Sequence, residues 1–270
     1  MGDYNQGSCK IETVRNTTLK IVDGGYLGNN KEVVIGKQDA SSSGTDNGYL
    51  LQTGGQLNIT GSGKLEIGYK APTSGTDGGI YTISGGSLIG TSGRMYIGCS
   101  GATGSIGKFD VNGTGGTISL GGELYIANDS STANNYTGTG TLQFDLNASG
   151  AVSKIQVLKT IIDSQGSSAA TANLIVNLTG AAPSGNLLLV ENTGTSSVVG
   201  LFDSLNGGSA AEGATVVLGG NTYTLTYMYD SVSGTKGLAR SATYNDIALI
   251  PEPATIALLG LGLIAIRRKK

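Results

Sequence analysis

The chain contains no histidine and no tryptophan, and it has only 4 prolines, 3 phenylalanines and 2 cysteines in 270 residues. Without histidine, no site can use an imidazole base or ligand, which excludes Ser-His-Asp triads, Cys-His pairs and histidine-bound zinc. Cys9 and Cys99 lie far apart in dissimilar contexts and form neither a disulfide framework nor a metal motif. We therefore expect no enzymatic activity and no metal or other cofactor.

Charge is also scarce and nearly balanced, with 17 basic and 19 acidic residues. Such a chain has no broad positive surface for nucleic acid, so we expect no nucleic-acid partner. Glycine, in contrast, is abundant: the 46 glycines are more than twice the usual share of about 7%. They follow no three-residue period, which excludes collagen.

The first half of the chain repeats with a period near 30 residues. One column of the repeat is a glycine pair followed by an aliphatic residue, at Gly24-Gly25 with Leu27, Gly54-Gly55 with Leu57, Gly85-Gly86 with Leu88, and Gly115-Gly116 with Ile118. A second column reads Ile35-Gly36, Ile67-Gly68, Ile97-Gly98 and Ile126-Ala127. A third alternates large residues, at Tyr49 and Leu51, Tyr81 and Ile83, Phe109 and Val111, and Leu142 and Phe144.

Each column has a period of two residues, which is typical of a short strand with one buried face. Three such strands in each repeat, separated by turn residues, predict an all-β fold, a right-handed parallel β-helix. Equivalent residues of successive coils should stack, so that the leucines and isoleucines of each column form a ladder. The glycines should supply positive φ at the corners of the coils.

The pattern divides the chain into four parts. Residues 1–23 are an N-terminal segment without the apolar core of a signal peptide, and we expect a truncated start. Residues 24–146 form the solenoid of four repeats. Residues 147–247 are either further irregular coils or a small β-sandwich, with a hairpin predicted from residue 216 to residue 229. Residues 248–270 form a distinct tail.

A shared Ser-Gly-Thr-Asp-x-Gly segment follows the isoleucine-glycine column in the first two copies. Asp46 and Asp77 in this segment have the chemistry of calcium ligands. They are also typical of turns in which the aspartate bonds to its own backbone, and only one carboxylate recurs in each coil. We therefore predict a turn and no metal site.

The tail has three parts. Pro251, Glu252 and Pro253 come first; the apolar run 254–266 and the basic cluster Arg267, Arg268, Lys269 and Lys270 follow. The run has 13 residues, about 20 Å as a helix, against about 30 Å for a bilayer core. We expect a short hydrophobic helix as membrane segment, formed by Ala254, Ile256, Leu258, Leu259, Leu261, Leu263, Ile264 and Ile266. The basic end favours the cytoplasmic side, with residues 1–250 outside.

This tail resembles the PEP-CTERM sorting signal, by which exosortase recognises its substrates in Gram-negative bacteria. The resemblance implies an exported protein that is anchored transiently in the inner membrane by its tail. An exosortase-type enzyme then processes it near Pro251–Pro253 and releases it to the cell surface or extracellular matrix. The repeats are similar, more loosely, to autotransporter passenger β-helices, which are often adhesins.

Together these features predict a structural or adhesion protein of the cell surface or extracellular matrix. The alternative is a polysaccharide-binding or polysaccharide-degrading β-helix, with extracellular polysaccharide as a second partner. Binding would use aromatic side chains as stacking platforms, the candidates being Tyr49, Tyr69, Tyr81 and Tyr96. Degradation would need carboxylates clustered on one face, whereas the 19 acidic residues are scattered along the sequence.

Overall fold

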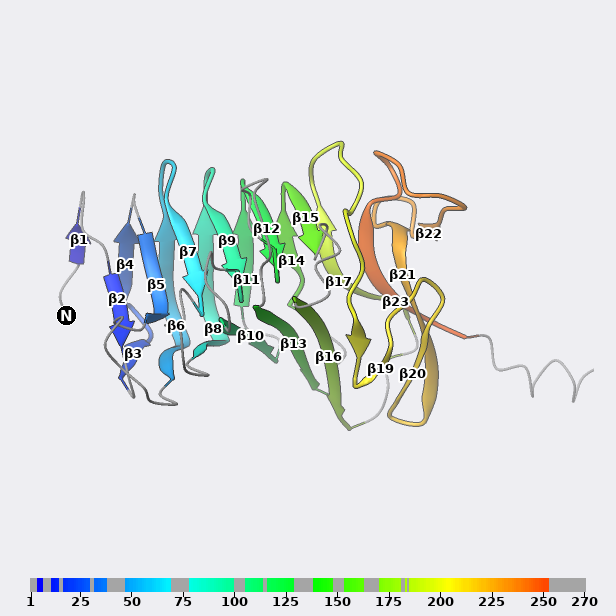
Figure 1. Ribbon diagram of the computed structural model, residues 1–270, viewed down its shortest axis with the longest axis horizontal. Helices are drawn as coiled ribbons and strands as arrows, with labels where there is room; N and C mark the ends of the chain where they lie inside the picture. The colour runs from blue at the N-terminus through cyan, green and yellow to red at the C-terminus, as the bar shows by residue number, and fades with distance from the viewer. Residues whose placement is uncertain are drawn as a thin grey trace, which may run out of the picture.

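The computed structural model describes residues 4–6, 11–14, 17–29, 32–37, 47–68, 78–99, 105–113, 116–128, 138–147, 153–162, 170–180, 183 and 185–252. The regular structure of these residues is entirely β, which confirms the all-β part of the predicted fold class. The strands lie side by side as the coils of a β-solenoid, followed by a smaller antiparallel unit toward the C-terminus (Figure 1).

One side of the solenoid is a six-stranded parallel sheet. Its strands are β2 (Ile11–Val14), β5 (Glu32–Lys37), β7 (Lys64–Ile67), β9 (Arg94–Ile97), β12 (Glu123–Ile126) and β15 (Lys159–Ile162). The strands follow one another at the repeat spacing, because each coil contributes one strand to this side.

A 17-stranded sheet forms the rest of the described structure. Its solenoid strands are β1 (Tyr4–Gln6), β3 (Thr18–Ile21), β4 (Tyr26–Asn29), β6 (Gly48–Ile59), β8 (Gly78–Gly90), β10 (Ile106–Asn112), β11 (Gly116–Leu120), β13 (Thr139–Asn147), β14 (Ile155–Val157), β16 (Thr171–Thr179), β17 (Leu187–Asn192) and β18 (Ser204–Leu205). An antiparallel cap continues it with β19 (Gly208–Ser209), β20 (Thr215–Leu218), β21 (Asn221–Asp230), β22 (Thr235–Lys236) and β23 (Asp246–Pro251). The predicted hairpin is confirmed, because β20 and β21 pair antiparallel.

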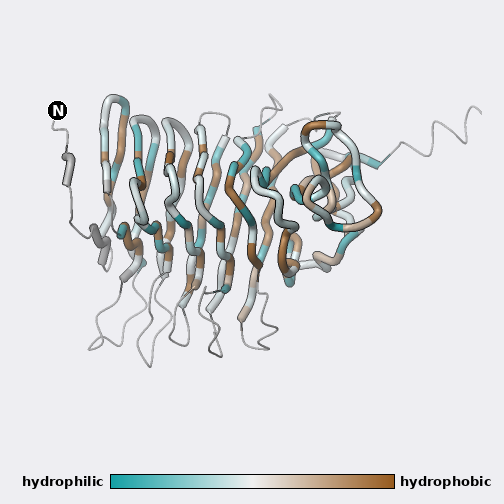
Figure 2. Tube along the Cα trace, turned by 90° about the horizontal axis from the view of Figure 1, so that it is seen from above, coloured by the Kyte–Doolittle hydropathy of each residue, from teal (hydrophilic) through white to brown (hydrophobic). Residues whose placement is uncertain are grey.

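The core consists of ladders of equivalent apolar residues. Leu57 pairs with Leu27 and Leu88, and Leu88 pairs with Ile118. The isoleucine column stacks in the same way. Its members pair in sequence order, each with the next: Ile35, Ile67, Ile97, Ile126 and Ile162. Both predicted ladders are confirmed. Figure 2 shows the coils from above, stacked beside one another with the cap at one end.

The corners have the expected left-handed backbone. The glycines of the isoleucine column, Gly36, Gly68 and Gly98, have φ angles of 77°, 74° and 63°. Ala127, which replaces glycine in the fourth copy, keeps the same conformation with φ at 49°. The shape of the coil therefore imposes this conformation, even on a residue with a Cβ atom.

One predicted column is wrong in its first copy. Leu50, rather than Tyr49 or Leu51, pairs with Tyr81 and is buried, and Gln52 lies opposite Ile83. Four large residues in a row gave no clean alternation, and a shift of one residue moves every side chain to the other face. Gln52 is tolerated in the core because it accepts a hydrogen bond from the Tyr81 hydroxyl and donates one to the Ser87 carbonyl.

The structure also corrects the predicted stacking platforms. Tyr81 has no exposed surface and Tyr96 is 4% exposed, so neither can receive a sugar ring. Tyr49 is half-buried, and Tyr69 lies outside the described residues.

Several other predictions fall outside the residues that the structure describes. They include the turns with Asp46 and Asp77, Cys9, and the hydrophobic helix of the tail. Cys99 is described and is buried. The right-handed course of the coils and the four domain boundaries stay predictions. Within the described ranges, no helix is long and apolar enough to cross a bilayer.

Gly68 and Gly61 make a matched test of the corner geometry. A Cβ atom at Gly68 would lie 2.1 Å from the Ile106 carbonyl oxygen, whereas at Gly61 it would meet nothing within 4 Å. Both residues have positive φ. Gly61→Ala should cost about 1–2 kcal/mol from backbone strain alone. Gly68→Ala should cost at least about 2 kcal/mol more, because the backbone of the next coil must move. Denaturant unfolding of both variants measures the difference, and equal costs would contradict a close-packed corner.

A pair of carboxylates lies on the outer side of the large sheet. Asp110 of β10 is 8% exposed and lies beside Asp145 of β13. Burial and the negative charge of Asp145 raise the pKa of Asp110 to about 6, although Lys108 and a hydrogen bond from Thr82 oppose the shift. Folding therefore favours the protonated form of this side chain.

Stability should consequently fall as the pH rises from about 4, near the pKa in the unfolded chain, to about 6. Asp110→Asn removes the ionisation while keeping the shape. At pH 7.5 we expect this variant to be more stable than the wild type by about 1 kcal/mol, with the two converging near pH 4. Urea unfolding at both pH values measures this. A difference independent of pH would contradict the proposed ionisation.

Candidate functional site: the strand that leads into the tail

Strand β23 joins the solenoid to its cap and leads directly into the tail. On one side it pairs antiparallel with β17, the last long solenoid strand, in a register that places Leu187 opposite Leu249. On the other side it pairs with β21 of the cap, which places Leu225 opposite the same Leu249. Ile247, Ala248 and Leu249 have no exposed surface. β23 is thus paired along both of its edges, and Figure 1 shows it between β17 and β21.

The pairing changes where the Pro-Glu-Pro element begins. The register with β17 ends at Leu249, whereas the register with β21 continues to Pro251, opposite Tyr223. Proline has no N–H group and is tolerated at such a half-paired position. Glu252 is exposed; its N–H donates to the Thr222 carbonyl over 2.9 Å, and its carboxylate accepts from the Thr224 hydroxyl over 3.0 Å. At Glu252 the chain is therefore bonded to β21 alone.

Of the predicted sorting residues, the structure places only these two. Pro251 is half-buried at the end of β23, and Glu252 follows on the surface. The remaining ones lie outside the described residues: Pro253, the membrane segment from Ala254 to Ile266, and Arg267, Arg268, Lys269 and Lys270.

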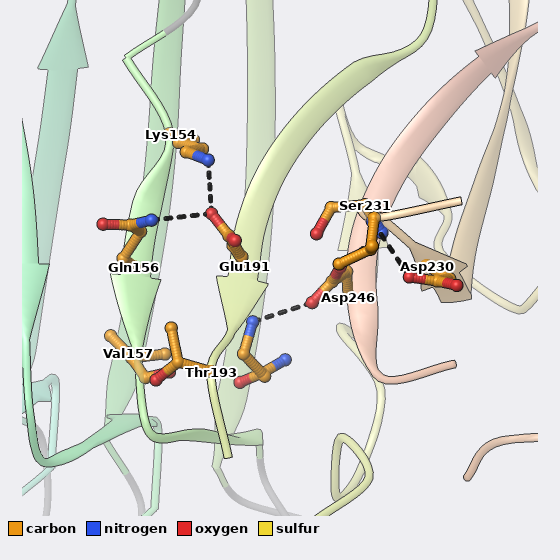
Figure 3. A network of polar contacts seen from close by, with 10 residues as sticks. Lys154, Gln156, Val157, Glu191, Thr193, Asp230, Ser231 and Asp246 are labelled. Atoms are coloured by element: carbon orange, nitrogen blue, oxygen red, sulfur yellow. Dashed lines mark hydrogen bonds and ion pairs between the residues drawn. The ribbon is translucent and has the colours of Figure 1, made fainter. Parts of the chain in front are cut away.

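Asp246 fixes the start of β23. Its Oδ1 accepts the Asn192 N–H over 2.8 Å and its Oδ2 accepts the Ser231 N–H over 2.9 Å, so that it connects β17 with the turn after β21 (Figure 3). The side chain is 3% exposed. Burial raises the pKa of Asp246 above its ordinary value, although both N–H groups stabilise its charged form.

Two asparagines extend this network into the solenoid. The Asn192 side chain donates to the Asn245 carbonyl and accepts the Thr160 hydroxyl over 2.7 Å. The Asn245 amide donates in turn to the Gly194 carbonyl over 2.8 Å. Because these groups are buried, each lost partner would leave an unsatisfied polar atom.

An ion pair lies next to Asp246 on the solenoid side. The Glu191 carboxylate contacts the Lys154 ammonium and accepts a hydrogen bond from the Gln156 amide over 2.9 Å (Figure 3). Burial acts to raise the pKa of Glu191, but the hydrogen bonds from Lys154 and Gln156 outweigh it, and the pKa lies below its ordinary value. Glu191 therefore stays charged and links β17 to the preceding coil.

The cap is joined to the solenoid at a second place. The Arg240 guanidinium donates to the carbonyls of Val198 and Gly200 over 3.1 and 2.9 Å, and lies 5.1 Å from the Tyr227 ring centroid. The Tyr227 hydroxyl donates to the Ala210 carbonyl and accepts the Phe202 N–H. The site as a whole is thus a network of hydrogen bonds and one ion pair that joins β23 and the cap to the solenoid.

The fold and this network define a β-solenoid whose final strand presents a C-terminal segment. A comparison with family models finds the PEP-CTERM protein-sorting motif at residues 249–270. The match confirms the resemblance seen in the sequence and covers the end of β23 as well as the tail. No curated protein and no solved structure matches the chain.

The motif implies exosortase-dependent export, with processing by that membrane enzyme and a final location at the cell surface or outside the cell. The described residues add the position of the motif relative to the fold. Its first residues, Leu249 and Ile250, belong to the paired strand, and Glu252, the last described residue, is exposed.

Sequence reasoning missed the polar anchor of β23. Asp246 and Asn192 are 54 residues apart, and nothing in a single sequence connects them. The one available signal was the polar pair Asn245-Asp246 directly before a fully apolar run, which is typical of a buried strand with a satisfied polar start.

Asp246→Ala should therefore destabilise the protein far more than a change at the exposed end of the same strand. The substitution leaves the N–H groups of Asn192 and Ser231 without acceptors, which should cost about 2–3 kcal/mol. Glu252→Ala, the control, removes an exposed contact and should change stability by about 0.5 kcal/mol or less. Thermal unfolding measures both. If Asp246→Ala unfolded at the wild-type temperature, the anchoring role would be refuted.

Proposed function

We propose that this chain is a non-enzymatic structural or adhesion protein of the cell surface or extracellular matrix of a Gram-negative bacterium. In this proposal the tail anchors it transiently in the inner membrane until an exosortase-type enzyme releases it. The solenoid then acts as a rigid rod outside the cell.

The observation that carries the proposal is the direct continuation of β23 into the sorting motif. A processing enzyme needs an accessible segment, and Glu252 is exposed and lies after Leu249, where the pairing with β17 ends. Cleavage on the N-terminal side of Leu249 would remove a residue that pairs with both neighbouring strands. A cut after Glu252 keeps the domain whole.

The rod itself supports a structural role. Its strands are joined by parallel pairing from β1 to β18, so each coil is held by its neighbours. Solenoids of this kind present long, regular surfaces that suit contacts with extended partners.

The alternative function is polysaccharide degradation, and the neighbouring carboxylates Asp110 and Asp145 are the candidate pair for it. Glycoside hydrolysis needs two carboxyl groups that are free to reach the substrate. The Asp145 oxygens instead accept hydrogen bonds from the amides of Gln143 and Asn177 over 2.7–2.9 Å, and Asp110 is 8% exposed. This geometry favours a structural pair. Turnover of any polysaccharide by the purified protein would overturn the non-enzymatic part of the proposal.

The tail can be tested directly by mass spectrometry of the mature C-terminus from the native host. We expect the released protein to end after Glu252 and to lack Arg267–Lys270, because β23 must remain for the cap to stay folded. A variant with Pro251–Pro253 replaced by alanines should remain unprocessed and associated with membranes. Release of a protein that retains Arg267–Lys270 would refute the sorting role.

A further inference from the structure

A hollow lies where the turns before β7 and β9 lead into the six-stranded sheet. It has a volume of about 320 Å³ and is lined by Ser62, Lys64, Ser92 and Arg94. Lys64 begins β7 and Arg94 begins β9, and the two residues are register partners in adjacent coils. Their side chains are 45% and 47% exposed. The repeat thus places two cations side by side in the lining of this hollow.

Buried aromatic residues support these cations from one side. Tyr96 and Tyr125 stack with their ring centroids 4.8 Å apart and an angle of 4° between the rings, and both are at most 5% exposed. The Lys64 ammonium lies 5.7 Å from the Tyr96 ring centroid, and Arg94 lies two residues before Tyr96 on β9. Such support reduces the loss of side-chain freedom on binding, since both cations are already held in position.

Two acidic residues orient the cations without covering them. The Arg94 Nε atom lies 2.8 Å from Glu123 Oε2, and the Lys64 ammonium lies 3.8 Å from Glu66 Oε1. The side chains of Glu66 and Glu123 are 7% and 23% exposed, so they lie deeper than the cations. A guanidinium has five N–H donors, and the contact at Nε leaves those at the Nη atoms for further partners.

The charged residues at the equivalent positions of neighbouring coils limit which polyanions can bind to Lys64 and Arg94. The register places Glu32 before Lys64, and the equivalent positions of the next two coils hold Glu123 and Lys159. A polyanion with closely spaced charges, such as duplex DNA with one charge for about every 1.7 Å of its axis, would meet these carboxylates. A polymer with isolated acid groups would not. The Ser92 hydroxyl donates to the Gly61 carbonyl, so its oxygen is suited to accept from a sugar hydroxyl.

We propose that this hollow binds an acid group of an acidic polysaccharide, with Lys64 and Arg94 contacting a carboxylate or a sulfate. The inference rests on the proposed function in one respect: the protein must be outside the cell to meet such a polymer. The contact itself depends only on the residues of the hollow. An uncharged polysaccharide should not bind there, because it offers nothing to the two cations.

The test measures binding of the purified full chain to four probes by biolayer interferometry. The probes are a hyaluronan oligomer, which carries a carboxylate on every second sugar, a sparsely sulfated dextran, neutral dextran and duplex DNA. We expect binding to the hyaluronan oligomer or to the sparsely sulfated dextran that weakens with salt, and much weaker binding to the other two. The first two probes distinguish a carboxylate from a sulfate as the preferred group.

The variants place the binding in the hollow. Lys64→Gln and Arg94→Gln should each weaken binding about tenfold. Lys20→Gln is the matched control, since it removes one exposed cation from β3 and should leave affinity unchanged. Glu123→Gln should strengthen binding several-fold by freeing Arg94, an effect that a purely structural role would not produce. Circular dichroism checks that each variant is folded.

Three results would overturn the inference: no binding to either acidic polymer, equal binding to neutral dextran or DNA, or equal losses in Lys20→Gln and Lys64→Gln. None of them affects export, which the mature C-terminus tests separately. Conversely, an unprocessed tail would refute the sorting role and leave the binding result standing.

Discussion

The structure depends on the burial of each coil's apolar residues by the coils on either side. Leu57 has no exposed surface because Leu27 and Leu88 lie directly above and below it in parallel register. One coil cannot bury these side chains alone, so its stability comes from its interfaces with its neighbours. The glycine corners serve the same requirement. They allow the backbone of one coil to approach the next closely enough for the ladders to meet, as at Gly68 against Ile106.

An array of parallel strands always ends in an unpaired edge, which attracts further strands and promotes aggregation. Here β17 would expose such an edge, and β23 covers it in the antiparallel direction. This reversal of strand direction ends the repeat, because a further coil could not pair with β23 in the parallel arrangement that joins the other coils. Asp246 secures the reversal by accepting N–H groups from both β17 and the turn after β21.

The sequence predicted the solenoid well wherever a column repeated without ambiguity. Leu57, Leu88, Ile67 and Ile97 could be placed because every copy of the repeat has a leucine or isoleucine at the equivalent position. The column with Tyr49 failed in its first copy because neighbouring large residues hide the alternation and Gln52 takes an apolar position. The tail motif was recognised from its residues alone. The contacts of Asp246 could not be predicted, because its partners are distant in the sequence and come together only when the cap folds back onto the solenoid.

The position of β23 also links folding to sorting. This strand is the last part of the domain to be synthesised, and it must pair with β17 and β21 before the edge of the solenoid is closed. Until then, the residues that begin the sorting motif, Leu249 and Ile250, are not held in a sheet. Once β23 is paired, Glu252 is fixed at the surface by its contacts with Thr222 and Thr224. The sorting motif therefore has a fixed starting point in the folded protein, because its first residues belong to the strand that completes the fold.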